Sequence, residues 1–167
     1  MRKLILFLVL LVSTLSVNAN TVQWYAWNES LPEECYKVNG CSAYFFVGDA
    51  TFLDDIVSSI NTGTFNTKDS ISSGKMSWGW ASGSFLLDKP MGTTVSVFMI
   101  VFNSGNYKNA TSYIIGNIQT QTVDYGPLNY YFQDNDFTPW QAIPEASVFV
   151  MLLAGVCIWA LKRPIKR

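Results

Sequence analysis

Between residues 20 and 132, apolar positions recur mainly with a period of two, which is typical of β-strands. The strongest of these stretches, 93–102, is apolar on both faces, so we expect it to be a central strand of a sheet. In 21–27 both faces are apolar or aromatic as well, which predicts burial on both sides. Further strands are expected at 43–47, 85–87, 110–123 and 128–132. The polar end of one of them, 119–122, is typical of a sheet edge.

One stretch, 51–61, has a helical period instead. Four apolar residues fall on one face of a helix there: Leu53, Ile56, Val57 and Ile60. Thr51 followed by Asp54 is a capping signal, and Gly63 suits the exit from the helix. The pattern therefore predicts a short helix after the second strand.

These elements together predict a mostly β (α+β) domain over residues 20–132. We expect an antiparallel sheet or a sandwich-like core with one short helix, followed by a spacer over 133–143. The length is that of one domain and is sufficient for a hydrophobic core.

A stretch rich in Ser, Thr and Gly, 63–84, carries Met76, Trp78 and Trp80 at alternate positions. The pattern favours a strand that buries this row against the core. Alternatively, the row is exposed, and the indole rings stack on sugar rings. In that case Trp78 and Trp80 are the candidate glycan-stacking residues.

The two ends of the chain have the pattern of targeting segments. Arg2 and Lys3, the nine apolar residues 4–12, and the small residues before position 20 predict a secretory signal peptide over 1–19. At the other end, the 16 residues 146–161 carry no charge. As a helix they would span about 24 Å, somewhat less than the ~30 Å of a bilayer's hydrocarbon core.

A cluster of cations follows this apolar run: Lys162, Arg163, Lys166 and Arg167. Basic flanks stay on the cytoplasmic side of a membrane, and long basic side chains can reach the interface. We therefore expect a single membrane-spanning helix with its C-terminal end in the cytoplasm and the rest of the chain outside.

The last 24 residues, 144–167, resemble the PEP-CTERM sorting signal of exported Gram-negative bacterial proteins, which joins a Pro-Glu-Pro-like motif, one hydrophobic helix and a basic terminus. The motif residues are Pro144, Glu145 and Ala146, with alanine where the family has proline, and Pro164 interrupts the basic terminus. The resemblance implies recognition by an exosortase, cleavage near the motif, and delivery to the cell surface or extracellular matrix, often alongside exopolysaccharide production.

Cys35 and Cys41 lie in the exported part, whereas Cys157 lies inside the C-terminal apolar run. Asn39-Gly40 signals a two-residue hairpin turn, which would place Cys35 and Cys41 about 10 Å apart along the strands. A disulfide needs Cα atoms within about 7 Å, so the tight hairpin and the bridge exclude each other. We expect the bridge, because two free thiols would be unusual in an exported protein.

Charge and composition remove several classes of function. Residues 20–143 carry five cations and eleven anions, a net charge of −6, and such a domain repels nucleic acid. The chain has no histidine, the usual general base and a common metal ligand. The oxygen-rich triplet 134–136 lacks the glycine and the distal glutamate of a calcium-binding EF-hand loop. We expect no enzyme activity, no cofactor and no metal.

The sequence thus predicts an exported protein whose partners are the membrane, a signal peptidase and an exosortase-like sorting enzyme. The first expected function is that of a cell-surface or extracellular-matrix component. The alternative is a polysaccharide-binding surface module that uses exposed aromatic side chains.

Overall fold

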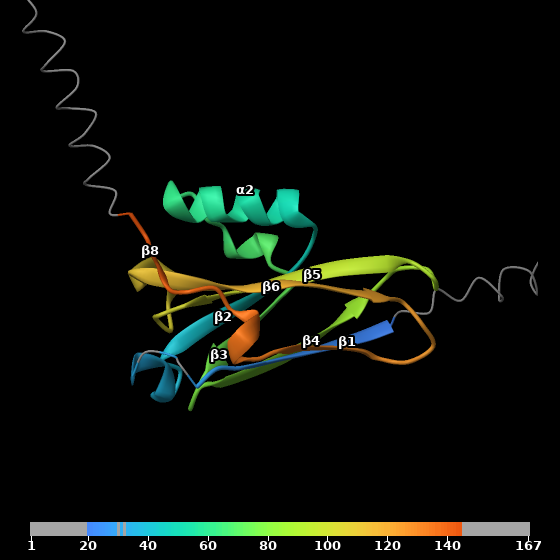
Figure 1. The fold of residues 1–167 in the computed structure, drawn as a ribbon, viewed down its shortest axis with the longest axis horizontal. Helices are drawn as coiled ribbons and strands as arrows, with labels where there is room; N and C mark the ends of the chain where they lie inside the picture. The colour runs from blue at the N-terminus through green and yellow to red at the C-terminus, as the bar shows by residue number, and fades with distance from the viewer. Residues whose placement is uncertain (1–19, 30, 32, 145–167) are drawn as a thin grey trace, which may run out of the picture.

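A computed structural model describes residues 20–29, 31 and 33–144 (Figure 1). The expected signal peptide, 1–19, and nearly all of the expected sorting signal lie outside these residues. Within the described part, no helix has the length and apolarity needed to cross a membrane. The membrane helix expected over 146–161 falls outside that part.

The described residues form two sheets and one α-helix, so the predicted mostly β fold is confirmed. One sheet has the strand order β4-β1-β7, and the other has the order β3-β2-β5-β6-β8. Strand pairs are antiparallel except β1 and β7, which are parallel. The bounds are β1 Asn20–Trp27, η1 Glu33–Tyr36, β2 Cys41–Val47, α2 Ala50–Asn61, η2 Thr67–Asp69, β3 Ser72–Met76, β4 Trp80–Leu87, β5 Thr94–Phe102, η3 Tyr107–Asn109, β6 Ser112–Thr122, β7 Leu128–Phe132, η4 Asp134–Asp136 and β8 Gln141–Ala142.

The three-stranded sheet packs against one face of the five-stranded sheet, and α2 lies over the other face (Figure 1). The central strand β5 contributes to both interiors, as its two apolar faces predicted. Val97 and Met99 belong to the core between the sheets, whereas Phe98 and Ile100 belong to the core under α2. Because side chains alternate along a strand, the single strand β5 contributes side chains to both cores.

Trp24 is the largest side chain between the two sheets and is fully buried. Its indole stacks on Phe45 at 5.8 Å between ring centroids, and its Nε1–H donates to Ser72 Oγ at 3.0 Å. A Cβ atom added at Gly83 would lie 2.6 Å from the indole, and one added at Gly74 would lie 3.0 Å from it. The ring therefore fits only because two neighbouring positions have no side chain.

The outer face of β1 differs from the prediction. Val22, Trp24 and Ala26 are buried, but Trp27 on the other face is 48% exposed and Tyr25 is partly exposed. The prediction that 21–27 is buried on both sides is therefore wrong. The small sheet has a single covered face in the described part of the chain, and aromatic residues occupy the open one.

Helix α2 begins one residue before its predicted start. Asp49, not Thr51, is the N-cap, and its Oδ1 accepts a hydrogen bond from the Phe52 N–H at 3.1 Å. Gly63, just beyond the C-cap Thr62, has a φ of 72°, as a helix exit favours.

The segment 133–143, which we expected as a spacer, lies against the domain. Phe137 and Trp140 pack against the core between the sheets. The Ile143 N–H donates to the Thr111 carbonyl at 2.8 Å, next to the short strand β8. The chain is thus held to β6 up to the residue before Pro144.

Candidate functional site

The alternating Trp row folds as a hairpin and does not form a single strand. β3 ends at Met76, β4 begins at Trp80, and Trp78-Gly79 is the turn between them. The Ser77 N–H donates to the Trp80 carbonyl at 2.9 Å, and the Trp80 N–H donates back at 3.0 Å. The prediction of one strand through this row is wrong, because a tight turn interrupts the alternation.

The three apolar residues of the row consequently have different surroundings. Met76 is fully buried, whereas Trp78 is 73% exposed and Trp80 is 47% exposed. The conservative interpretation, in which the row is buried against the core, thus applies to Met76 alone. The two tryptophans singled out as candidate stacking residues are both accessible.

Trp78 has a backbone conformation that is rare for a residue with a side chain. Its φ is 58° and that of Gly79 is 74°, the positive pair that a type I′ turn requires. Asn or Gly is usual at this first position, and a left-handed residue with a Cβ costs about 1–2 kcal/mol. Because the Trp78 side chain is mostly in solvent, its burial offsets little of this conformational free energy. Strained residues of this kind concentrate at functional sites.

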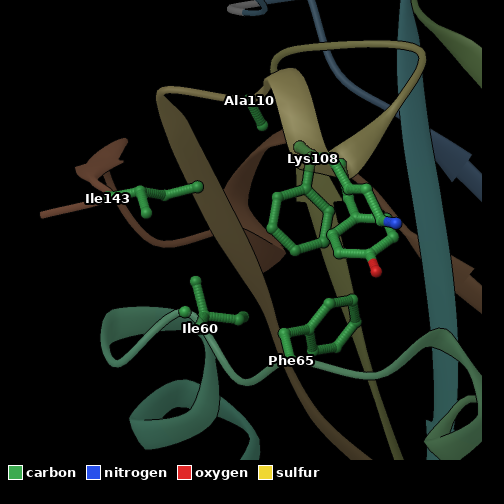
Figure 2. A pocket seen from close by; sticks show the side chains of 8 residues that line it. Ile60, Phe65, Lys108, Ala110 and Ile143 are labelled. Atoms are coloured by element: carbon green, nitrogen blue, oxygen red, sulfur yellow. The ribbon is translucent and has the colours of Figure 1, made fainter. Parts of the chain in front are cut away.

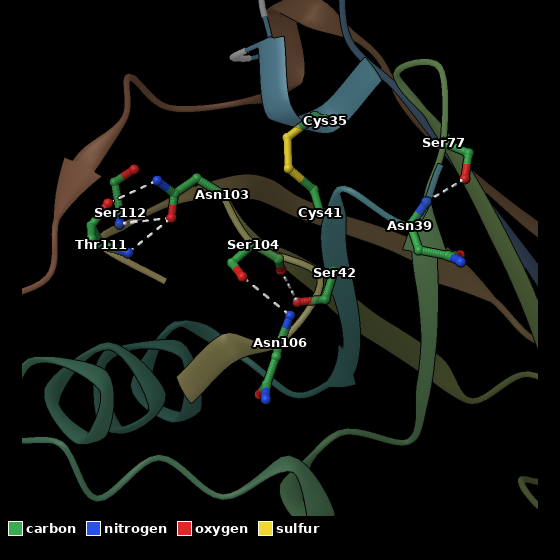
Figure 3. Close-up of a disulfide and its surroundings, with 10 residues drawn as sticks. All are labelled: Cys35, Asn39, Cys41, Ser42, Ser77, Asn103, Ser104, Asn106, Thr111 and Ser112. Carbon is green, nitrogen blue, oxygen red and sulfur yellow. Dashed lines mark hydrogen bonds between the residues drawn. A yellow bond between two sulfur atoms is a disulfide. The ribbon is translucent and has the colours of Figure 1, made fainter. Parts of the chain in front are cut away.

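The predicted disulfide between Cys35 and Cys41 is confirmed, with Cα atoms 4.7 Å apart (Figure 3). The loop between them turns at Lys37–Gly40, where the Gly40 N–H donates to the Lys37 carbonyl at 3.1 Å. We expected the bridge to exclude a tight hairpin about Asn39-Gly40, and the Lys37–Gly40 turn stands in its place.

The disulfide loop holds the Trp78 turn on both sides. The Asn39 N–H donates to Ser77 Oγ at 3.0 Å (Figure 3). The Gly79 N–H donates to the Cys35 carbonyl at 3.3 Å. Because the residues directly before and after Trp78 are both bound to this loop, the loop fixes the backbone of the turn that carries the indole.

Aromatic side chains gather on the open face of the three-stranded sheet. Tyr25 of β1 stacks on Tyr131 of β7, with ring centroids 5.1 Å apart and planes 11° apart. Tyr25 also contacts Trp80 of β4, with centroids 5.7 Å apart. Trp27 is the register partner of Trp80. We call these four residues, Tyr25, Trp27, Trp80 and Tyr131, the outer aromatic cluster; it adjoins the Trp78 turn.

Polar side chains occupy the next register position along the same face. Gln23 lies opposite Ser84 on one side and Asn129 on the other. Its Oε1 accepts a hydrogen bond from the Tyr25 hydroxyl at 2.9 Å, which joins this polar row to the aromatic cluster. No outward position on these three strands carries Asp, Glu, Lys or Arg: the residues are Thr21, Gln23, Tyr25, Trp27, Trp80, Ser82, Ser84, Leu86, Asn129 and Tyr131.

A hollow lies on the other side of the five-stranded sheet, near the end of α2 (Figure 2). It has a volume of about 310 Å³ and a mainly apolar lining with one cation. The lining residues are Ile60, Gly63, Phe65, Phe102, Tyr107, Lys108, Ala110 and Ile143. Tyr107 and Lys108 supply the polar groups of this lining. The exposed aromatic face carries both of the tryptophans that the sequence singled out, so it is the stronger candidate.

The acidic triplet 134–136 has a structural role. Asp134 Oδ1 accepts from the Glu29 N–H at 2.6 Å, and Asp136 Oδ2 accepts from the Gln133 N–H at 2.8 Å. In the described part of the chain, no three His, Cys, Asp or Glu residues come together as metal ligands would.

The structure brings together four residues that the sequence singled out, Trp78 and Trp80 with the bridged Cys35 and Cys41, at one end of the sandwich. Pro144 is described but Glu145, Ala146 and the basic tail lie outside the described residues. Tyr25, Trp27 and Tyr131 were missed as site residues, although the uncharged aromatic face of 21–27 was a signal for Tyr25 and Trp27. Neither a protein-family model nor a curated protein matches this chain.

Proposed function

We propose that this protein is an exported cell-surface or extracellular-matrix protein that binds polysaccharide through the outer aromatic cluster and Trp78. A pyranose ring has an apolar face of C–H groups and a rim of hydroxyl groups. Exposed Trp and Tyr rings offer large rigid surfaces on which the apolar face can stack. The neighbouring amide and hydroxyl side chains, Gln23 and Ser84 among them, can form hydrogen bonds with the hydroxyl groups.

The observation that carries this proposal is the conformation of Trp78. The residue has a positive φ, its side chain is mostly in solvent, and the turn that bears it is braced by a disulfide loop. A tryptophan contributes little to stability in such a place, whereas an exposed indole on a braced turn is well suited to stacking on a ligand.

The binding test uses the full chain, purified in detergent, and exopolysaccharide from the protein's own cells immobilised on a biosensor. We expect Trp78→Asn to weaken binding about tenfold or more, equivalent to ~1.4 kcal/mol. Asn suits the positive φ, so the turn is retained. Tyr125→Ala is the matched control, because Tyr125 is 85% exposed but lies in the loop before β7. The end of β7 near the Trp78 turn is the opposite one, where Phe132 pairs with Ala26. Equal binding by wild type and Trp78→Asn would contradict the proposal.

Export and sorting are part of the same proposal, and residues 1–19 and 144–167 support them. In this scheme a signal peptidase removes the first segment, and an exosortase-like enzyme acts at Pro144 and Glu145. Replacing both residues by alanine in the native host should block processing and surface delivery. Unchanged intact masses in the membrane and released fractions would show that the motif is not used.

The alternative is a purely structural surface component without a glycan ligand. The exposed aromatic face would then be covered by other copies of the chain. Failure to bind any polysaccharide, together with concentration-dependent association that Trp78→Asn or Trp80→Ala abolishes, would favour this alternative.

A further inference from the structure

We infer that the ligand is a neutral polysaccharide, whose chain runs along β1 from the outer aromatic cluster to the Gln23 row. This inference rests on the proposed function and adds the chemical class of the ligand. The observation behind it is that aromatic, amide, hydroxyl and aliphatic side chains make up the whole outward face of β4, β1 and β7.

Charge on this face would be expected if the ligand were acidic. Proteins hold carboxylates and sulfates with Arg and Lys, because charge-assisted hydrogen bonds are shorter and stronger than neutral ones. None of the ten outward residues of the small sheet supplies such a donor. Lys75 of β3, near the hairpin, belongs to the larger sheet and donates to the Gly105 carbonyl in the loop after β5.

The surroundings of the face add repulsion. The segment 28–41, which follows Trp27 and includes the disulfide loop, carries three Glu and one Lys. Asp134 follows β7 and lies against the Glu29 backbone at 2.6 Å. With the net charge of −6 over 20–143, the field here opposes the approach of a polyanion, particularly at low ionic strength.

The polar row offers the neutral contacts that sugar hydroxyls require. Gln23 uses its Oε1 for the Tyr25 hydroxyl, which leaves its amide N–H groups to donate elsewhere. Ser84 and Asn129 flank it in register on the two neighbouring strands. Hydroxyl and amide groups both donate and accept, so together they can satisfy a ligand whose every substituent does the same.

The spacing of the two rows matches a chain that lies along the strand. Tyr25 and Gln23 are two residues apart on one face, which is about 6.6–6.8 Å. That distance is of the order of one pyranose unit and slightly exceeds it. A sugar that lies over Tyr25 therefore places the next unit of an extended chain near Gln23. Trp80 pairs with Trp27, one step further along the same face.

The test compares a polyuronate with its carboxyl-reduced form, which has the same linkages and no charge. Binding of the full chain to each is measured at low and at physiological salt. We expect the reduced, neutral polymer to bind at least tenfold more tightly at low salt, with a smaller difference at high salt. Equal or tighter binding of the polyuronate, with loss of binding in Trp78→Asn, would overturn the neutral class and leave the proposed function standing. Binding of neither polymer, nor of the native exopolysaccharide, would overturn both.

A designed cation gives a second measurement. Ser84→Lys places one ammonium group in the polar row, and we expect it to strengthen polyuronate binding several-fold without strengthening binding of the reduced polymer. Ser58→Lys, on the exposed side of α2, makes the same change in net charge away from this face. Equal gains in polyuronate affinity in the two variants would show that the affinity depends on net charge alone. That result would count against recognition at the Gln23 row.

Discussion

The side-chain amide of Gln119 on β6 donates a hydrogen bond to the main-chain carbonyl of Tyr131 on β7, with an N···O distance of 2.6 Å. Gln121 makes the same contact with the Asn129 carbonyl, also at 2.6 Å. The two donors are two residues apart on β6, and the two acceptors are two residues apart on β7, in the reverse order. The contacts thus resemble those of an antiparallel pair of strands, with side-chain amides as the donors. The pair joins the five-stranded sheet to the edge of the small sheet and satisfies carbonyl groups that an open edge would expose.

We expect Gln119→Ala and Gln121→Ala each to lower the free energy of unfolding by about 1 kcal/mol, because each removes one such bond. Urea-induced unfolding measures this. Thr122→Ala is the control, since Thr122 is an exposed residue of the same strand. Losses no larger than that of the control would show that the glutamine contacts add nothing. The double variant should also associate more strongly at high concentration, because the edge of β7 is then open.

Gly83 allows the Trp24 indole to lie between the sheets. An added Cβ would lie 2.6 Å from the ring, so we expect Gly83→Ala to destabilise the protein by about 1–3 kcal/mol through overpacking. Gly126→Ala is the matched control, because a Cβ added there would meet no atom within 4 Å. The comparison uses thermal or urea unfolding of both variants, and equal stability would contradict the role given to Gly83.

Trp78→Asn should stabilise the fold while it weakens glycan binding. Asn tolerates the left-handed conformation, and Asn-Gly is the preferred pair of a type I′ turn, so we expect a gain of about 0.5–1 kcal/mol in the free energy of unfolding. Trp80→Asn, at a strand position, should produce no such gain. A loss of stability in Trp78→Asn would mean that the indole contributes more to the fold than its exposure indicates.

The disulfide should contribute to glycan binding as well as to global stability. By the chain-entropy estimate, a bridge over so short a loop stabilises by about 2 kcal/mol. In Cys35→Ser/Cys41→Ser the loop that bonds Ser77 and Gly79 loses its closure, so we expect glycan affinity to fall several-fold while circular dichroism shows a folded protein. Val38→Ala, in the same loop, is the control. Unchanged affinity in the folded double variant would show that Trp78 is positioned without the bridge.

Stability should fall at alkaline pH. Burial raises the pKa of Tyr130, whose hydroxyl donates to the Val95 carbonyl at 3.4 Å, and burial is also the main cause of the raised pKa values of Tyr44 and Tyr113. In the unfolded chain these phenols ionise near their ordinary pKa of 10.0, while in the folded protein they stay neutral to higher pH. Stability is therefore fully present below about pH 10 and decreases as pH rises through and above that value.

Urea unfolding between pH 8 and 11 measures this decrease. Tyr130→Phe should reduce its slope, because one group that ionises only on unfolding is gone. Tyr125→Phe, at an exposed position, should leave the slope unchanged. The same slope in both variants would show that Tyr130 does not contribute to the pH dependence.

Much of the fold was predictable from local patterns. The two apolar faces of 93–102 determined a central strand, because a strand that is apolar on both sides is stable only between two layers. The helical period determined α2, and the six-residue separation of Cys35 and Cys41 allowed either a bridge or a tight hairpin, of which the bridge formed. The polar residues 119–122 lie on the outer part of β6, beyond its pairing with β8, as an edge was expected to.

The tertiary structure alone decided which aromatic residues are accessible. Trp78 looked like a strand residue, because tryptophan is rare at a turn position with positive φ. Trp27 looked buried, and its face is open because the small sheet has one covered side in the described part of the chain. Tyr131 reaches Tyr25 only through the parallel pairing of β7 with β1, across more than a hundred residues of sequence. Periodicity records which side chains share a face; whether another segment covers that face depends on contacts between distant parts of the chain.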